Sequence, residues 1–218
     1  MEQTPPKAAV RGTGRPDRRA RRRQETIHEI LAIARDVMNT EGVNGLSLAE
    51  IARRLGVQPP SLYKYFPSLM GIYDALFLEG QRENLEAMRG GMEEAEPGLD
   101  ALISGLEASG RWSLANRAVA ELLFWRPVPS FEPSPEAFAV SIEMVELQRV
   151  ALADAVAKGQ LGPGANDEGA IFLVSTLIAG VLGQAIANEP ELPWGEGRFT
   201  SQFPGLMRLL PAAFPLEG

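Results

Sequence analysis

The chain has 218 residues, of which 45% are hydrophobic, and it contains no cysteine. This length suits one large domain, or a small domain joined to a larger one, and the lack of cysteine excludes disulfides, thiolate metal sites and cysteine nucleophiles. The net charge of −7 hides an asymmetry: residues 1–66 hold twelve Lys/Arg and seven Asp/Glu, whereas residues 67–218 hold nine and twenty-one. This indicates a basic module that meets a polyanion, joined to an acidic body that does not.

Residues 1–23 are rich in proline, glycine and arginine, and eight of them are lysine or arginine. No apolar periodicity runs through this segment, so we predict a disordered basic arm. Such an arm is able to lie against phosphates, although a solvated leader with no specific role is the alternative. No apolar run follows its basic residues, which argues against a secretory signal, and the absence of cysteine fits a reducing cytoplasm.

One helix is predicted before a short middle segment, and another helix is predicted after it. Apolar residues between Ile27 and Met38 recur at the helical spacing of three and four, which predicts a first helix from near Glu25. Ser68 is a suitable N-cap for a later helix over residues 69–89.

The middle segment is expected to contain two short helices separated by a glycine turn. SLAE has the form of a capping box, in which the Ser47 hydroxyl accepts from a backbone amide and the Glu50 carboxylate reaches back. The helix that it starts ends at Gly56. A third helix is expected over residues 58–66, because proline suits a first helical turn. A helix, a tight glycine turn and a helix within about twenty residues form the helix-turn-helix signature.

The third helix, QPPSLYKYF, is the candidate DNA-reading element. Leu62 and Phe66 lie four residues apart and are expected to face the core, which leaves polar, flat and small side chains on the opposite side. Tyrosine hydroxyls and a lysine suit backbone phosphates, whereas proline offers an apolar contact to a thymine methyl. Each residue alone favours an ordinary half-buried aromatic or a solvated charge, whereas the residues together, with the capping box, the glycine turn and the basic N-terminal part, favour DNA binding. The predicted DNA-binding residues are Ser47, Gln58, Pro60, Ser61, Tyr63, Lys64 and Tyr65.

The stretch GVNGLSLAEIARRLGVQPPSLYKYFPSLMGIYDALF resembles the DNA-binding domain of the TetR/AcrR family of transcriptional regulators. The resemblance covers residues 25–80 and rests on the two glycines before the second helix, on AxxxGV, and on LYKYF followed by a serine-capped helix. It implies an all-α, Ω-shaped homodimer with three N-terminal DNA-binding helices and a larger helical C-terminal domain that holds an inducer and dimerises. The chain departs from the family's pattern at Leu69, where lysine is common, and at Pro59 and Pro60, where glycine or a polar residue is frequent.

We therefore divide the chain into a basic arm (1–23), a helix-turn-helix DNA-binding domain (24–68) and a helical inducer-binding and dimerisation domain (69–218). Residues 169–188 carry no charge and are long enough to cross a membrane. Their polar residues and acidic flanks instead favour a helix buried in protein. Together with a final helix over residues 199–210, this helix is the expected dimer interface; packing within one subunit is the alternative.

The expected inducer site lies in the C-terminal body. Large or polar residues on its helices are candidates, although an aromatic or a methionine at helical spacing also fits an ordinary core. An acidic body without a basic pocket argues against a phosphate-rich inducer and favours an unidentified lipophilic or cationic small molecule. The candidate inducer-binding residues are Trp112, Arg117, Glu121, Phe124, Trp125, Phe138 and Met144.

The sequence argues against an enzyme. His28 is the single histidine and has no acidic cluster around it in the sequence, and no glycine loop of the Walker type is present. We therefore expect no catalytic residue, no cofactor and no metal site. The favoured function is a cytoplasmic, ligand-responsive transcriptional regulator, expected to repress, that binds a palindromic DNA operator as a homodimer and is released by an inducer. A helical protein–protein adaptor that no longer reads DNA is the alternative.

Overall fold

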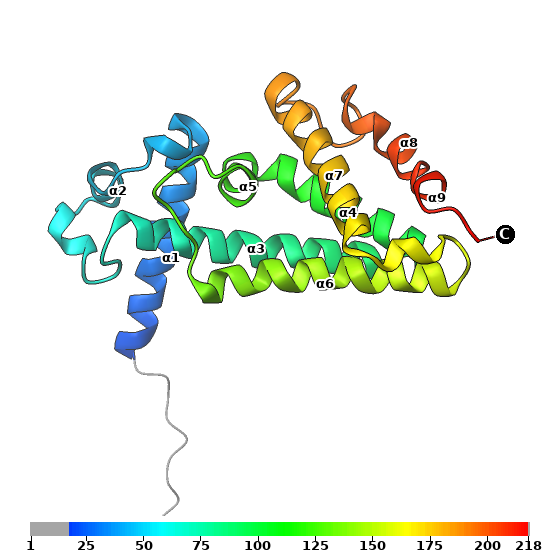
Figure 1. Cartoon of the computed structure of the whole chain (residues 1–218). Coiled ribbons are helices and arrows are strands. Elements are labelled where there is room, and N and C mark those ends of the chain that lie inside the picture. Colours follow the sequence, from blue (N-terminus) through cyan, green and yellow to red (C-terminus); the bar gives the residue numbers. More distant parts are fainter. Residues whose placement is uncertain (1–17, 218) are drawn as a thin grey trace, which may run out of the picture.

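The computed structural model describes residues 18–217, and every regular element within them is a helix. This confirms the predicted all-α fold, with an N-terminal helix-turn-helix unit and a larger helical C-terminal body (Figure 1). The α-helices are α1 (Arg18–Glu41), α2 (Leu48–Leu55), α3 (Leu69–Glu93), α4 (Leu99–Ala115), α5 (Arg117–Phe124), α6 (Pro135–Ala157), α7 (Glu168–Asn188), α8 (Phe203–Met207) and α9 (Leu210–Ala213). Short 3₁₀ helices are η1 (Val43–Gly45), η2 (Pro59–Leu62), η3 (Pro163–Asn166) and η4 (Thr200–Gln202).

Helix α1 begins at Arg18, so the prediction of a disordered arm is wrong for residues 18–23. Arginine, alanine and glutamine favour the helical conformation, and Arg21 also pairs with Glu25 one turn later, with an Nε–Oε1 distance of 3.4 Å. The positive charges of this segment are therefore carried on helical turns. Residues 1–17 of the predicted arm lie outside the described residues.

The N-terminal unit packs α1, α2, η2 and the first half of α3 around one apolar core, to which α5, the loop after it and the start of α6 also contribute. Ser47 caps α2 as predicted, because its Oγ accepts a hydrogen bond from the amide of Glu50 at 3.2 Å. Gly56 ends the helix in the left-handed conformation, with φ of 73°, which glycine adopts without strain. The fully buried members of this core include Ile30, Ile51, Leu62, Ile72 and Leu76.

The predicted third helix is wrong in its extent, because residues 59–62 form a single 3₁₀ turn that is followed by a turn through Tyr65. The amides of Ser61 and Tyr65 bond to carbonyls three residues back. Pro67 disfavours the α conformation of the residue before it, so the segment is short, and short helical segments commonly wind as 3₁₀ turns. The candidate reading element therefore presents its side chains from a tight turn.

Tyr73 ties α3 to the start of the helix-turn-helix. Its side chain is 2% exposed, and its hydroxyl donates to the carbonyl of Val43 at 2.7 Å. Replacing Tyr73→Phe should lower the free energy of unfolding by about 1–3 kcal/mol, because the buried carbonyl is left without its donor. Urea unfolding measures the change, and Tyr63→Phe is the matched control at an exposed ring. Equal stability of the two variants would contradict the role of this hydrogen bond.

Helix α3 runs from the N-terminal unit into the C-terminal body and contributes to both cores (Figure 1). Tyr73, in its first half, belongs to the N-terminal core. Met88, in its second half, belongs to a second core built with α4, α6, α7 and the short terminal helices. Helix α3 therefore connects the two ends of the molecule, and a domain boundary after residue 68 stays a prediction.

Helices α3 and α4 approach each other closely where glycines face the neighbouring helix. A Cβ atom on Gly91 would lie 2.6 Å from the carbonyl oxygen of Ser104 and 2.7 Å from the Cβ of Ala108. A Cβ atom on Gly105 would lie 3.1 Å from the carbonyl oxygen of Met88. The contact between the two helices therefore depends on the absence of side chains at these positions.

The predicted single helix over residues 199–210 is wrong, because this segment is divided into η4, α8 and the start of α9. Pro204 and Pro211 each lie in the first turn of a new short helix. A proline has no amide hydrogen with which to continue a preceding helix, so the chain breaks there. The role of this segment in a dimer interface stays a prediction.

Helix α7 lies close to its predicted range of 169–188. It is long and apolar enough to cross a membrane by length and composition, and 33% of its most apolar window is buried in the structure. The buried side packs in the second core. The other side includes Phe172, which is 66% exposed, so α7 keeps an uncovered apolar face.

Candidate functional site

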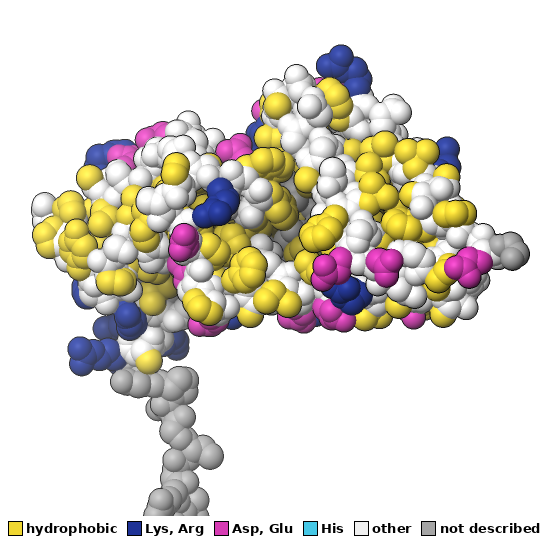
Figure 2. Space-filling view, in the orientation of Figure 1, with side chains coloured by type: hydrophobic (Ala, Val, Ile, Leu, Met, Phe, Trp, Pro, Cys, Tyr) yellow, Lys and Arg dark blue, Asp and Glu magenta, His cyan; other side chains and the backbone are white. Residues whose placement is uncertain are grey.

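A basic hollow lies between the start of α1 and the turn after η2. Arg23 donates from Nη1 to the carbonyl of Lys64 at 3.2 Å, which joins the two elements. The ring of Tyr65 lies close to both cations, with the Arg23 guanidinium 5.5 Å and the Lys64 Nζ 4.9 Å from the ring centroid. Figure 2 shows Lys and Arg side chains gathered at this end of the molecule. The residues that line the hollow are Arg19, Arg22, Arg23, Thr26, Lys64 and Tyr65.

The Tyr65 hydroxyl has a lowered pKa, first because of a hydrogen bond with Thr26, and then because Lys64 and Arg23 lie nearby. Both neighbouring cations favour a negative group at this point. The same field would attract a phosphate oxygen. The positive charge of the hollow thus suits a phosphate group.

The predicted DNA-binding residues lie at or near the surface. Tyr63 is 55% exposed, and its neighbours Leu62 and Phe66 are buried, as the four-residue spacing predicted. Exposed members of the set are Gln58, Pro60, Tyr63 and Lys64; half-buried members are Ser47, Ser61 and Tyr65. The structure therefore leaves these side chains accessible from one stretch of chain, and their contact with DNA stays a prediction.

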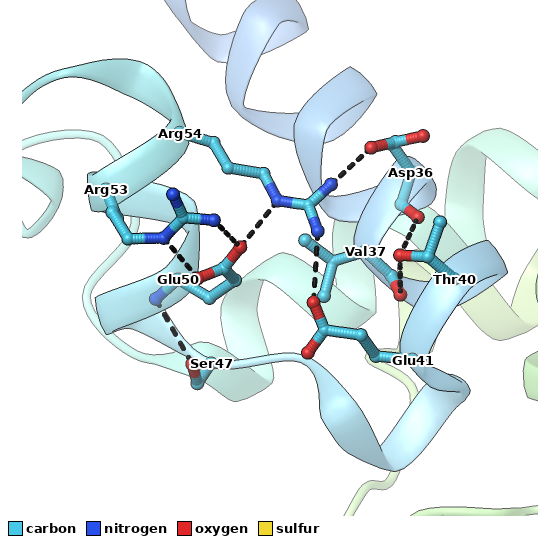
Figure 3. Close-up of polar contacts among 8 residues, drawn as sticks. All are labelled: Asp36, Val37, Thr40, Glu41, Ser47, Glu50, Arg53 and Arg54. Carbon is cyan, nitrogen blue, oxygen red and sulfur yellow. Dashed lines mark hydrogen bonds and ion pairs between the residues drawn. The ribbon is translucent and has the colours of Figure 1, made fainter.

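An acidic cluster orients the arginines of α2 (Figure 3). The Arg54 guanidinium donates to Glu50 at 2.6 Å, to Glu41 at 3.0 Å and to Asp36, which ties α2 to the end of α1. Arg53 Nε donates to Glu50 at 2.7 Å. The predicted reach of Glu50 back to the start of α2 is thus wrong, because two arginines one turn away compete for its carboxylate. Arg54 has a positioning role within the N-terminal unit.

The hydrogen bonds from Arg53 and then Arg54 lower the pKa of Glu50 to about 2. A carboxyl group with a lowered pKa stabilises the fold above its unfolded pKa, which is about 4.3, and this contribution is lost as the pH falls toward the folded value. Replacing Glu50→Gln should therefore destabilise the protein at about pH 6 and have a much smaller effect at about pH 2. Urea unfolding across this range is the measurement, with the exposed Glu132→Gln as control. A Glu50→Gln effect that is the same at both pH values would contradict the ion-pair role.

A cavity of about 340 Å³ lies in the C-terminal body. It is bounded by α3, α4, α5, α6 and α7, and Figure 2 shows a hollow with hydrophobic walls beside α7. Phe124, Phe138 and Met144 of the predicted inducer residues line it. The full lining is Phe77, Gln81, Met88, Leu106, Ser109, Leu123, Phe124, Phe138, Ser141, Met144, Val145, Gln148, Ser175, Ile178, Ala179 and Leu182.

The other four predicted inducer residues lie outside this cavity. Trp112 packs against the N-terminal core. Arg117 binds the carbonyl of Pro190 and the carboxylate of Glu191. Trp125 meets Phe124 edge-on with ring centroids 5.7 Å apart, and Glu121 is half-buried on α5. Helical spacing alone could not tell which side of each helix faces the cavity.

Two glutamines that line the cavity were not among the predicted residues. Gln81 and Gln148 are buried, and the Oε1 atom of each has no hydrogen-bond partner among the described residues; the Ser141 Oγ is in the same state. Their signal in the sequence was a polar residue placed within the apolar face of a long helix. The side chains come from α3 and α6, so only the packing of these helices brings them together.

A family model described as "Bacterial regulatory proteins, tetR family" matches residues 30–76, which include the second half of α1, all of α2 and η2, and the start of α3. The helix-turn-helix part of the chain therefore matches the tetR family. Members of the tetR family are DNA-binding regulatory proteins, in agreement with the expectation that the chain is not an enzyme.

Relatives of this chain include an HTH-type transcriptional regulator of Mycobacterium bovis, 26% identical over 152 residues that cover 68% of this chain and 65% of the relative. The match thus spans just under two thirds of that relative. Among solved structures, the TetR family transcriptional regulator PfmR from Thermus thermophilus is 21% identical, with a TM-score of 0.63 over 83% of this chain and 96% of that one. The transcriptional regulator FadR from Bacillus subtilis in complex with stearoyl-CoA is 16% identical, with a TM-score of 0.66 over 84% and 96%. Both likenesses concern the fold.

Proposed function

We propose that the chain is a cytoplasmic, ligand-responsive transcriptional repressor that binds a palindromic DNA operator as a homodimer. The observation that carries the proposal is the exposed turn after η2, which lies beside the basic hollow of α1. The major groove is about 12 Å wide and accepts a helical element. Tyr63 and Lys64 are the accessible side chains at the tip of this element, and the hollow supplies charges for the adjoining phosphates.

A second copy of the chain is the proposed cover for the open face of α7. Phe172 and Leu209 are exposed on α7 and just before α9, and a Cβ atom on Gly180 would have no neighbour within 4 Å. A two-fold symmetric pair would bury this apolar surface. It would also hold two reading elements at a fixed separation, which a palindrome with half-sites about one helical turn apart requires.

The response to a ligand is proposed to pass through α3. Phe77 lines the cavity and also packs against Phe131, with ring centroids 5.9 Å apart. Phe131 contacts Tyr73 at the same separation, and Tyr73 holds the Val43 carbonyl. A ligand that moves Phe77 would therefore act on side chains that position the N-terminal unit. The complex of FadR with stearoyl-CoA supports a small-molecule site in this fold.

The alternative of a protein–protein adaptor rested on Leu69. This side chain is half-buried and packs against the N-terminal core. Its difference from the lysine that is common in the family thus has a packing explanation, and the basic hollow offers other phosphate contacts. No observation favours the adaptor over the regulator.

Selection from a random duplex library by the purified chain tests the proposal. We expect enrichment of a palindromic sequence and an affinity that falls steeply and linearly with the logarithm of salt concentration. Sedimentation of the complex should give two chains per duplex. A selection that enriches no sequence, or binding that is insensitive to salt, would contradict the proposed function.

A further inference from the structure

The cavity in the C-terminal body has the size and the wall of a small-molecule site. Its volume of about 340 Å³ lies within the usual range for ligand pockets, about 300–1,000 Å³. Most of its lining is aliphatic or aromatic. Phe124 and Phe138 line it and are also exposed at the surface, so they lie at its mouth. A ligand that enters between them would leave solvent for a mainly apolar interior.

Three side-chain oxygen atoms in this apolar wall lack hydrogen-bond partners among the described residues. Gln81 is 4% exposed and Gln148 is 7% exposed, and the Oε1 atom of each is buried without a hydrogen bond within the described chain. The Ser141 Oγ is likewise unpartnered, and it lies seven residues before Gln148 on the same face of α6. Each such group costs about 1–3 kcal/mol of desolvation when it stays unpaired. Native proteins bury few of them, so a cluster inside one cavity indicates a bound partner with hydrogen-bonding groups.

The charge of the ligand follows from what the wall lacks. None of the described residues that line the cavity is Asp, Glu, Lys, Arg or His. A charged ligand would be buried without a counter-ion, which costs several kcal/mol per ion in proteins. The rings of Phe77, Phe124 and Phe138 would stabilise a cation by about 0.5–2 kcal/mol each through cation–π interactions. No carboxylate in the lining would accept a hydrogen bond from that cation. The cationic option expected from the acidic composition is therefore disfavoured, because the acidic residues lie elsewhere.

We propose that this cavity binds an uncharged, largely apolar small molecule whose hydroxyl or amide group hydrogen-bonds with Gln81, Ser141 and Gln148. The glutamine amides offer both donors and acceptors, and the serine hydroxyl offers both as well. Apolar walls supply affinity, and the three polar groups select against a plain hydrocarbon, because that ligand would leave them unpaired. The proposal rests on the proposed function for its consequence, the release of DNA, and not for the binding itself.

Matched probes test the ligand class on the full chain in the absence of DNA. The set is 4-pentylphenol, pentylbenzene, 4-pentylbenzoate and 4-pentylbenzylamine, measured by isothermal titration calorimetry. We expect the phenol to bind about tenfold more tightly than pentylbenzene, in line with one hydrogen bond of about 1.4 kcal/mol, and the two ions to bind more weakly than either. Tighter binding of an ion, or no binding of the phenol up to its solubility limit, would overturn the proposal.

Two variants locate the site. Gln81→Met and Gln148→Met should each reduce the affinity for the phenol about tenfold and leave pentylbenzene unchanged, whereas the exposed Gln202→Met should change neither. The ligand-free Met variants should be at least as stable to urea as the wild type, because an unpaired buried amide is removed. Phenol binding that both variants leave unchanged, or a loss of stability in both, would refute the assigned role of these amides.

A separate measurement with the selected duplex distinguishes the two proposals. If the phenol binds with the expected pattern and the DNA complex persists, the ligand class stands and the ligand-responsive part of the proposed function fails. If the DNA complex forms and no uncharged probe binds, the regulator stands and the ligand class fails.

Discussion

Replacing Tyr63 and Lys64 together with alanine should weaken binding to the selected operator by about ten- to a hundredfold. Both side chains are exposed on the turn after η2, and loss of direct DNA contacts costs about 1–3 kcal/mol per good contact. Loss of the Lys64 charge should also reduce the slope of affinity against salt by about one ion. Fluorescence anisotropy with a labelled duplex at several salt concentrations gives both values.

The fold should survive this double substitution, because the buried neighbours Leu62 and Phe66 stay in place. Arg149→Ala is the control for charge: it removes one positive charge from α6, where Arg149 pairs with Glu146, and should leave DNA affinity unchanged. Circular dichroism and sedimentation check that each variant is folded and has the same oligomeric state. Unchanged DNA affinity in the folded double variant would contradict the proposed contact between DNA and the turn after η2.

Replacing Gly91→Ala should lower the free energy of unfolding by about 1–3 kcal/mol, the usual cost of overpacking a closely packed contact. The new Cβ would lie 2.6 Å from a backbone oxygen of α4 and 2.7 Å from the Cβ of Ala108. Neither neighbour is the end of a flexible side chain, so relief requires the two helices to separate. Chemical unfolding monitored by circular dichroism measures the loss.

The adjacent glycine provides a matched control. Gly90 is exposed on the same helix, and a Cβ atom there would meet nothing within 4 Å. Gly90→Ala should therefore raise the free energy of unfolding by about 0.5–1 kcal/mol, because alanine restricts the unfolded chain and favours the helix. Changes of opposite sign in the free energy of unfolding at these two neighbouring positions would show that the loss at Gly91 comes from the close approach of α3 and α4. A stabilising effect of Gly91→Ala would contradict it.

The N-terminal unit was predictable because its signals are local. Ser47 caps α2, Gly56 ends it, and the spacing of apolar residues by three and four in α1 fixes which side of that helix is buried. Each of these is set by residues within one or two turns. The length of η2 was harder to predict from the sequence. Pro67 disfavours the α conformation of the residue before it, and this effect competes with the helical propensity of the segment.

The cavity could not be assigned from the sequence. Its lining comes from five helices, and the side that each helix turns inward depends on packing between segments far apart in the chain. Phe124, Phe138 and Met144 line the cavity, and their contact with an inducer stays a prediction. The aromatic character of Trp112 and Trp125 was equally compatible with other contacts. Gln81 and Gln148 show the missing information, since their unpaired state exists only in three dimensions.

The membership of α3 in both cores limits how this protein can be divided. A fragment that stops at Ser68 would lack Tyr73, Leu76 and Phe77, which belong to the N-terminal core, and we expect such a fragment to be unfolded in isolation. A chimera that exchanges DNA specificity between relatives would thus need its junction beyond Phe77. Under the proposed function, operator binding and effector sensing would both depend on α3, so a recombination junction would have to lie in the second half of this helix.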